Sequence, residues 1–342
     1  MAQLKVELNI SAELGQVSAA VQRAERIGFD GVTISEMGRD CLLASALACE
    51  HSSVLDVATE IALAFPRSPM ITAMNAWELQ RFSGNRFVLG LGTQVKGHIE
   101  RRFSSYWDKP AAQMREYIES LRAIWSAFRG EGPLRYTGKY YNLSLLSPEF
   151  NPGGSAGDAD VPVHIAAVNP LTARLAGQLC DGIRVHRFHS QAYLENVLRP
   201  AVQLGGEARD PNRTAPFEWC FMVMIVTGSS ARELESSKEA ARHSIAFYGS
   251  TRSYSRVTAS VGGEHLVPEL HELSLRGDWK SMPALIDDSL LEKIAVVGPH
   301  DELAGRLRER YAAVADRISV RLPSSDTATT QAWTRVLEDL KG

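Results

Sequence analysis

Two turns in this chain combine small and polar residues in a pattern that suits a ligand. The first, GLGTQVKGH over 90–98, places two glycines and a threonine at the end of a predicted strand. The second, AAVNPLTARLAG over 166–177, places Asn169 just before a predicted helix whose first turn contains Thr172. Proline is tolerated in the first turn of a helix, and the free N–H groups there favour an anion such as a phosphate. Asn169 could equally serve only as the cap of that helix.

A pair of histidines, His186 and His189, follows another predicted strand, with Arg184 and Arg187 beside them. An imidazole that titrates near neutral pH is suited to delivering a proton. Either histidine could instead be a loop residue that is hydrogen-bonded to the backbone. The His-x-x-His spacing could also hold a metal, but no cluster of carboxylates accompanies it, so we expect no metal site.

Predicted strands and amphipathic helices alternate along the chain and must position these residues. In the first predicted helix, over 16–27, apolar residues recur at helical spacing, and Gly28 stands where the helix would end. Eight strands alternating with helices indicate a parallel sheet that closes into a (β/α)8 barrel, the TIM-barrel fold. An open doubly wound sheet is the alternative, but no dinucleotide-binding fingerprint follows the first strand. The strands are predicted over 4–10, 31–36, 57–65, 86–93, 161–168, 182–188, 219–227 and 317–322.

The alternation continues to the end of the chain, so we expect residues 1–342 to form a single barrel domain. Two segments, about 103–160 and 231–291, are longer than a barrel needs and are predicted to be insertions after strands. Loops at the carboxyl ends of the strands form the active face of such barrels. We therefore expect the 231–291 segment to close over the substrate, with Phe65, Tyr106 and Trp107 as pocket walls.

Composition excludes several classes of protein. The chain has 342 residues, with 37 Lys and Arg against 40 Asp and Glu, which lacks the basic excess of a dedicated nucleic-acid binder. The longest apolar run, over 219–226, is far short of the roughly 18 residues that span a bilayer, and no membrane association is expected. The first residues read as a strand rather than as a secretory signal, so a cytoplasmic protein is expected. Neither a disulfide framework nor a zinc site is indicated by the spacing of Cys41, Cys49, Cys180 and Cys220.

Several phrases resemble the luciferase-like superfamily of flavin and deazaflavin barrels. They are GFDGVTISE over 28–36, AFPRSP over 64–69, LQRFSGNRFVLGLGTQVKGHIERRF over 79–103 and VPVHIAAVNPLTARLAGQLCDGI over 161–183. Their order and spacing extend over nearly the whole chain. In detail the chain is similar to the coenzyme F420-dependent oxidoreductases of that superfamily.

This resemblance implies a site at the open end of the barrel, where the deazaflavin ring of F420 would lie. A backbone bulge after the third strand, often with a non-prolyl cis peptide bond, would support the ring, and it matches Ala64-Phe65, with Phe65-Pro66 as the other cis candidate. Glu36 matches the acidic residue that ends the second strand, although it could also be a buried charge that holds a turn. The cofactor-binding positions implied are Glu36, Ala64, Phe65, Thr93, Gln94, His98, Ala166, Ala167, Val168, Asn169 and Thr172, and the catalytic candidates are His186, Glu36 and His98.

The chemistry implied is hydride transfer between C5 of the deazaflavin and a small organic substrate. Relatives that oxidise alcohols or sugar phosphates carry a histidine after the second-strand acid and a glutamate in the fourth-strand loop. This chain has Met37 and Val95 at those positions, which favours a reductase. By analogy with the family, a homodimer formed through barrel helices is expected.

Two alternatives remain open. An FMN-dependent monooxygenase of the same barrel would use reduced flavin and oxygen. A barrel that binds a flavin without catalysis, or that only dimerises, would also lack the histidine and glutamate pair.

Overall fold

The computed structural model describes residues 3–155, 158 and 160–342, and within them eight parallel strands close into a barrel. The order round the barrel is β3-β2-β1-β13-β10-β9-β8-β5, and the ring closes where Val57 of β3 pairs with Phe87 of β5. The predicted (β/α)8 barrel is therefore confirmed. The eight strands of the ring are β1 (Lys5–Ile10), β2 (Gly31–Ile34), β3 (Asp56–Thr59), β5 (Phe87–Gly92), β8 (Val163–Ala167), β9 (Gly182–Val185), β10 (Glu218–Met222) and β13 (Arg317–Val320). The short strand β4 (Ala62–Leu63) continues from β3 and also pairs with β5.

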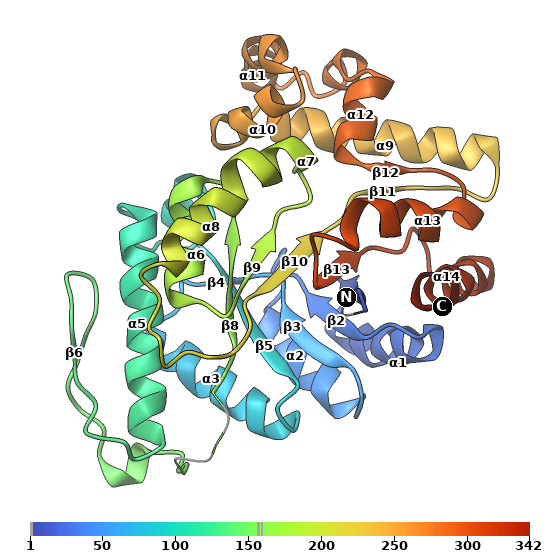
Figure 1. The fold of residues 1–342 in the computed structure, drawn as a ribbon. Helices are drawn as coiled ribbons and strands as arrows, with labels where there is room; N and C mark the ends of the chain where they lie inside the picture. Colours follow the sequence, from blue (N-terminus) through green and yellow to red (C-terminus); the bar gives the residue numbers. More distant parts are fainter. Residues whose placement is uncertain (1–2, 156–157, 159) are drawn as a thin grey trace.

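Helices surround this barrel, as Figure 1 shows, and their ends are fixed by local sequence. Helix α1 (Val17–Ile27) ends where Gly28 takes the left-handed conformation, with φ of 97°, that glycine adopts without a steric penalty. Helix α3 (Pro69–Phe82) begins after Ser68, whose hydroxyl accepts a hydrogen bond from the amide of Ile71. The other helices packed round the barrel are α2 (Cys41–Glu50), α5 (Pro110–Phe128), α6 (Pro170–Leu179), α7 (Gln191–Tyr193), α8 (Arg199–Gly206), α13 (His300–Tyr311) and α14 (Thr327–Lys341).

Several predicted strands are shorter in the structure, and two of them are broken. The strand predicted over 57–65 is interrupted, because β3 and β4 are separated by a bulge at Glu60 and Ile61, and the peptide bond between these two residues is cis. The cis bond predicted at Ala64-Phe65 or Phe65-Pro66 is absent from both places. The strand predicted over 219–227 leaves the barrel after β10, and β11 (Ile225–Val226) pairs with β12 (Val296–Val297) in a separate small sheet.

The barrel interior is polar and ionic at its centre. The Arg184 side chain is only 2% exposed and donates from one terminal nitrogen to Glu7 and Glu60, both at 3.1 Å. Arg317 pairs with Asp56 at 2.6 Å and with Glu218 at 3.0 Å, near the amino ends of the strands. Buried charges of this kind persist only when they are paired.

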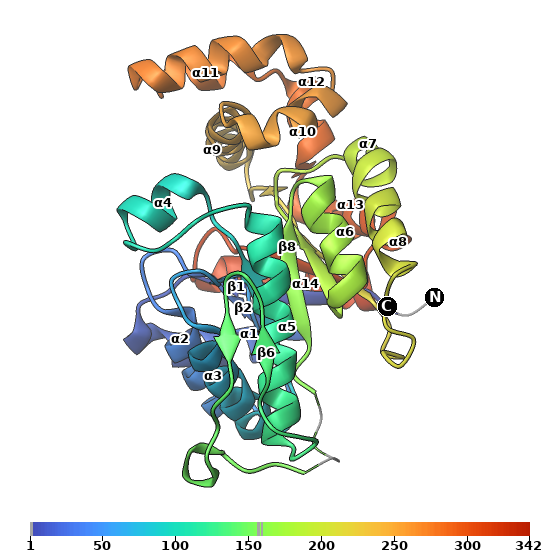
Figure 2. The same cartoon turned by 90° about the vertical axis from the view of Figure 1, so that its left-hand side faces the viewer.

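The 231–291 segment forms a helical layer beyond the carboxyl ends of the strands. It contains α9 (Ala231–Gly249), α10 (Ser255–Ser260) and α11 (Val267–Arg276), and α12 (Asp288–Ile294) follows directly. Figures 1 and 2 show these helices above the barrel, on the side to which the strands point. Among the residues that the structure describes, no helix combines the length and apolarity needed to cross a membrane.

Candidate functional site at the barrel mouth

Glu60, in the bulge between β3 and β4, anchors one side of the barrel mouth. Its side chain is buried, and one carboxylate oxygen accepts hydrogen bonds from Ser319 at 2.6 Å and Thr33 at 2.8 Å. The same oxygen accepts from the Asn9 amide at 3.1 Å, and the other oxygen accepts from Arg184. Charge-assisted hydrogen bonds are among the stronger ones, so four strands hold this carboxylate in place. These hydrogen bonds fix the bulge, and with it Ile61, to the barrel interior.

Ile61 is the next residue, and it fits against the glycines of β5. A Cβ atom at Gly92 would lie 2.8 Å from Cγ1 of Ile61 and closer still to Cδ1. A Cβ atom at Gly90 would overlap the carbonyl oxygen of Thr59. The close approach of β5 to the bulge strand therefore explains both glycines without contact with a ligand.

Glu36 lies just after β2, and its carboxylate is fully engaged. Arg67 donates to its two oxygens at 2.6 and 2.9 Å, and the amide of Leu63 donates at 2.7 Å. Arg67 also pairs with Asp40 at 2.7 Å. Glu36 is therefore a largely buried carboxylate that holds β4 and the turn after it in place, which is the second of the two roles that its sequence position allowed.

His186 follows β9 and is enclosed by aromatic rings from the helical layer. Its ring centroid lies 4.7 Å from that of Tyr248 and 5.0 Å from that of Tyr254. Burial, and after it the charge of Arg187, lowers the pKa of His186 to about 3. The imidazole is therefore neutral at pH 7. The expectation that His186 titrates near neutral pH and delivers a proton there is wrong. Because Nδ1 accepts from the amide of Phe188 at 3.2 Å, the proton is on Nε2, and this N–H can still donate a hydrogen bond.

His189 is held inside the protein. Its ring nitrogens lie 2.8 Å from the carbonyl oxygen of His186 and 3.1 Å from the hydroxyl of Tyr311. Burial lowers its pKa to about 4. His189 is therefore a hydrogen-bonded loop residue, which is the alternative that its sequence context left open.

The predicted residues after β5 take three different environments. The Thr93 hydroxyl donates to the carbonyl of Gln94 at 3.1 Å, and Gln94 has a positive φ of 54°. The Gln94 side chain accepts from the amide of Val95 at 3.0 Å. His98 lies on α4 (Lys96–Arg101) and is exposed. Thr93 and Gln94 thus stand at the rim, whereas His98 is directed to solvent.

The predicted residues after β8 surround the start of α6. Asn169 is its cap, because the side-chain oxygen accepts from the amide of Thr172 at 3.0 Å and from the Thr172 hydroxyl at 3.2 Å. The Val168 carbonyl accepts from the Tyr193 hydroxyl at 2.6 Å. Ala167 is buried and Ala166 is half-buried. On the bulge side, the predicted contacts Ala64 and Phe65 are both buried, at 0% and 5% exposure.

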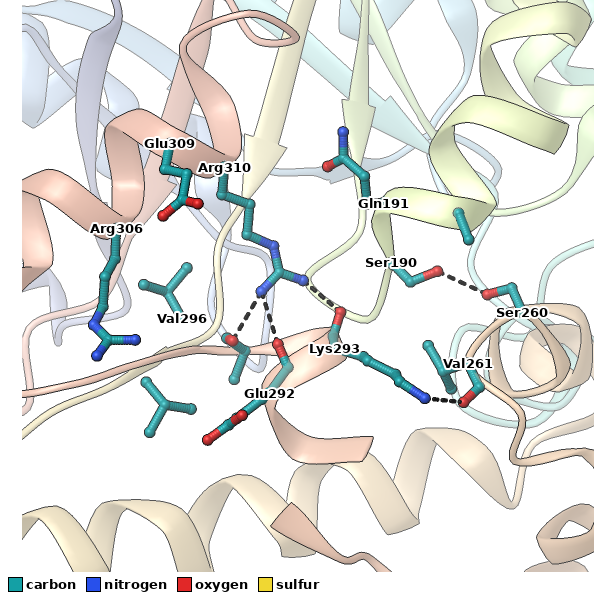
Figure 3. Close-up of a pocket in the computed structure, with 13 residues that line it drawn as sticks. Ser190, Gln191, Ser260, Val261, Glu292, Lys293, Val296, Arg306, Glu309 and Arg310 are labelled. Carbon is teal, nitrogen blue, oxygen red and sulfur yellow. Dashed lines mark hydrogen bonds between the residues drawn. The ribbon is translucent and has the colours of Figure 1, made fainter. Parts of the chain in front are cut away.

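Two cavities lie beside the mouth rather than over its centre. One of about 460 Å³ contacts Phe65 and is walled by Tyr106, Tyr140 and Tyr141. The other, of about 630 Å³, lies between α7, α12 and α13 (Figure 3). Its basic side chains are already engaged, because Arg310 donates to carbonyls at the end of α12 and Lys293 donates to the carbonyl of Val261 at 3.0 Å. This larger cavity therefore offers little to a ligand, despite its volume.

One group of two buried residues and one half-buried residue has the residue types of a metal site. His164, Glu218 and Cys220 have ligand atoms within 4.8 Å of one another, near the amino ends of the strands. Burial and the charge of Arg184 hold the pKa of His164 well below its usual range. The positive charges of Arg184 and Arg317 around this group disfavour a cation there.

Comparison with known proteins identifies the family. The profile of the luciferase-like monooxygenase family matches residues 2–317. The chain belongs to this family.

Several relatives and structures are similar to this luciferase-like protein. An uncharacterised protein of Mycobacterium tuberculosis is 41% identical over 339 residues, which cover 99% of this chain and 98% of that protein. Another protein of M. tuberculosis, named as a coenzyme F420-dependent oxidoreductase, is 26% identical over 324 residues, 90% of each chain. The structure of the F420-dependent tetrahydromethanopterin reductase of Methanopyrus kandleri superposes with a TM-score of 0.78 at 19% identity and 99% coverage of both chains. A Baeyer-Villiger monooxygenase component of Pseudomonas putida in complex with FMN superposes with a TM-score of 0.64 at 16% identity, covering 99% of this chain and 97% of that one.

The luciferase-like barrel also contains residues at its mouth to which the sequence patterns do not point. Glu60 is one, although an acidic residue within the apolar run VATEIALAF is a signal that could have indicated it. Arg321 is another, since it follows β13 and donates at 2.8 Å to Asn9 of the neighbouring strand β1. No local motif marks Arg321, because its partners are about 300 residues away in sequence.

Proposed function

We propose that this luciferase-like protein is a coenzyme F420-dependent oxidoreductase that works in the reductive direction on a small organic substrate. The observation that carries the proposal is the anchored bulge: Glu60 fixes the backbone so that Ile61 lies against Gly92 at the mouth. An apolar surface on rigid backbone suits the face of a flat ring. The similarity to an F420-dependent oxidoreductase of M. tuberculosis and to the M. kandleri reductase supports this cofactor.

The residues at the mouth fit such a group. Ile61 would support the ring, and Thr93 and Gln94 would stand at its edge. The start of α6 would face a phosphate with the amide of Leu171, because Pro170 has no N–H and the amide of Thr172 donates to Asn169. F420, when bound, supplies the hydride at C5 of its deazaflavin ring. The protein supplies orientation and hydrogen bonding, and among its residues the Nε2–H of neutral His186 is the group suited to donate to a substrate atom on which negative charge develops.

The reductive direction rests on two apolar side chains. Met37 and Val95 occupy the positions at which alcohol-oxidising relatives carry an acid–base pair, and both are exposed. Neither can accept a proton, so this pair offers no base for the oxidation of an alcohol.

Titration of the purified protein with F420 and with FMN, followed by cofactor fluorescence, tests the proposal. We expect saturable binding of F420 at least tenfold tighter than that of FMN, and turnover that does not require oxygen. Tighter binding of FMN with oxygen-dependent turnover would instead establish the monooxygenase alternative. If neither cofactor bound, the barrel would be non-catalytic and the proposal would be wrong.

We also propose that two copies of the chain pair through α2 and α3. Helix α2 (CLLASALACE) is apolar on nearly all sides, which is unusual for a helix that faces solvent. Leu43 on α2 is 62% exposed, and Phe82, at the end of the adjacent α3, is 56% exposed. Sedimentation velocity should show a dimer that Leu43→Glu converts to monomer, whereas Leu275→Glu on the exposed face of α11 should leave it unchanged. A monomeric wild-type protein would refute this pairing.

A further inference from the structure

The cavity of about 460 Å³ beside the bulge strand is built from three parts of the chain that meet only in the fold. It lies between the turn over 65–68 that precedes α3, the loop before α5, and the tip of the hairpin formed by β6 (Tyr136–Thr137) and β7 (Asn142–Leu143). Figure 1 shows this hairpin alongside α5. Its volume falls within the range of about 300–1,000 Å³ that is usual for ligand sites. We call it the tyrosine cavity, after three residues in its walls, Tyr106, Tyr140 and Tyr141.

Aromatic rings form much of the wall of the tyrosine cavity. Phe65 and Tyr106, two of the residues expected from the sequence to be pocket walls, both line it. The ring centroids of Tyr106 and Tyr140 lie 6.3 Å apart, with the ring planes at 40° to each other. Tyr106 is 61% exposed, so much of its ring surface is left uncovered by the protein. Such rings favour contact with a flat molecule.

The two charged residues that line the cavity are both paired. Arg67 contacts Glu36 at 2.6 Å and Asp40 at 2.7 Å. Lys139 pairs with Asp108 at 2.9 Å. Neither cation is therefore free to select an anionic ligand.

A further carboxylate increases the negative charge near the cavity. Glu116, on α5, accepts hydrogen bonds from the amides of Lys139 at 3.0 Å and Tyr140 at 2.6 Å. The two cations in the wall thus stand beside four carboxylates, an excess of negative charge that disfavours an anion. Because these carboxylates already accept hydrogen bonds, they would gain little from a cationic ligand. The charges around the cavity therefore favour an uncharged ligand.

Two hydrogen-bond donors among the lining residues are incompletely used. Gln113, on α5, is 4% exposed, and its Nε2 lies 3.4 Å from the carbonyl oxygen of Tyr106 and 3.5 Å from the hydroxyl of Tyr141. Good N–H···O hydrogen bonds are about 2.9–3.0 Å long, so this buried amide is only weakly partnered. Among the residues that the structure describes, the only hydrogen bond of the Tyr141 hydroxyl is the one that it accepts from Gln113. The O–H of Tyr141 is therefore left to donate.

We propose that the tyrosine cavity is a binding site, separate from the barrel mouth, for a flat and uncharged molecule that carries a carbonyl group. The rings of Tyr106 and Tyr140 would contact its flat surface. The amide of Gln113 and the hydroxyl of Tyr141 would donate to its carbonyl oxygen, which supplies the acceptor that both donors lack. This inference goes beyond the proposed function and does not depend on which cofactor occupies the mouth.

Three naphthalene derivatives, measured by equilibrium dialysis on the full-length protein, test the site. They are 2-acetylnaphthalene, 2-ethylnaphthalene, which has nearly the same shape without the carbonyl oxygen, and the anion 2-naphthoate. We expect 2-acetylnaphthalene to bind about fivefold or more tightly than either of the others, as one lost hydrogen bond of about 1 kcal/mol implies.

Variants of the wall assign the binding to this cavity. Tyr106→Ala should weaken the binding of 2-acetylnaphthalene by about fivefold or more, whereas Tyr106→Phe, which keeps the ring, should stay within about twofold of the wild type. Gln113→Leu should weaken the binding of 2-acetylnaphthalene and leave that of 2-ethylnaphthalene unchanged. Phe150→Ala removes an aromatic ring that is 78% exposed elsewhere on the surface, and this matched control should bind all three probes like the wild type.

Oxidised F420 separates the tyrosine cavity from the mouth. At saturating F420, the affinity for 2-acetylnaphthalene should stay within about twofold of its value in the apoprotein. Displacement of the probe by F420, equal binding of the three probes, or wild-type affinity in a folded Tyr106→Ala protein would overturn the inference. If probe binding depended on Tyr106 but no F420 bound, the cavity site would stand and the proposed function would be wrong.

Discussion

A methyl group added at Gly92 is a direct perturbation of the surface that Ile61 forms at the barrel mouth. The new Cβ would lie 2.8 Å from Cγ1 of Ile61, whereas carbon atoms in good contact are about 3.5–4.0 Å apart. Ile61 must therefore move by roughly 1 Å or change rotamer. Overpacking costs about 1–3 kcal/mol, and we expect about 1 kcal/mol here because the half-buried Ile61 side chain can yield.

The loss of F420 binding free energy should exceed the loss of free energy of unfolding. If the ring lies on Ile61, displacing that side chain should weaken F420 binding about tenfold, which corresponds to about 1.4 kcal/mol. Fluorescence titration measures the affinity, and urea unfolding measures the stability. Unchanged F420 affinity in a Gly92→Ala protein whose stability has fallen by the expected amount would refute the contact between Ile61 and the ring.

Two other glycines provide matched controls. Gly90→Ala would place its Cβ against the backbone carbonyl of Thr59, which cannot rotate away, so we expect a stability loss of about 3 kcal/mol. Gly305→Ala, in α13, would meet no described atom within 4 Å and should stabilise the protein by about 0.5–1 kcal/mol with F420 affinity unchanged.

Three further predictions concern single side chains. Glu60→Gln should reduce the free energy of unfolding by about 3 kcal/mol in urea titrations, because Arg184 is left with one carboxylate; a change below about 0.5 kcal/mol would contradict the role of the buried pair. The pKa of His189 is lowered to about 4, so below the unfolded pKa of about 6.5 the unfolded chain binds the extra proton, and His189 alone should lower stability by about 2 kcal/mol between pH 7 and pH 5. His164 and His186, whose pKa values are also lowered, add to this fall, so His189→Phe should reduce it by about 2 kcal/mol without abolishing it, and an unchanged slope would exclude a contribution from His189. Asn169→Ala should cost about 1 kcal/mol of stability through loss of the α6 cap and should weaken F420 binding, and unchanged affinity would count against a phosphate at that helix start.

The barrel could be predicted from the sequence because its strands are short apolar runs separated by amphipathic helices. The extent of the runs could not, as the segment 219–226 illustrates. Every residue in that run is apolar, so nothing local indicates that β10 ends at Met222. The later part pairs instead with β12 (Val296–Val297), about 70 residues further along the chain, which only the tertiary structure specifies.

In the candidate site, too, features set by adjacent residues could be predicted from the sequence, and features set by distant strands could not. Asn169 could be recognised as a helix cap because the Asn-Pro pair and Thr172 are adjacent in sequence. The environments of Glu60 and Arg321 could not be predicted, since each depends on strands that meet only when the barrel closes. The lowered pKa of His186 likewise comes from burial, together with neighbours such as Arg187 and His189, and not from a motif.

A crystal structure of the protein with F420 would test the central claim most directly. We expect a ring at the barrel mouth with one face on Ile61, with Thr93 and Gln94 at its edge, and with the opposite side open toward His186. Ring density in the cavity between α7 and α13, or a mouth closed by side chains at saturating F420, would contradict it.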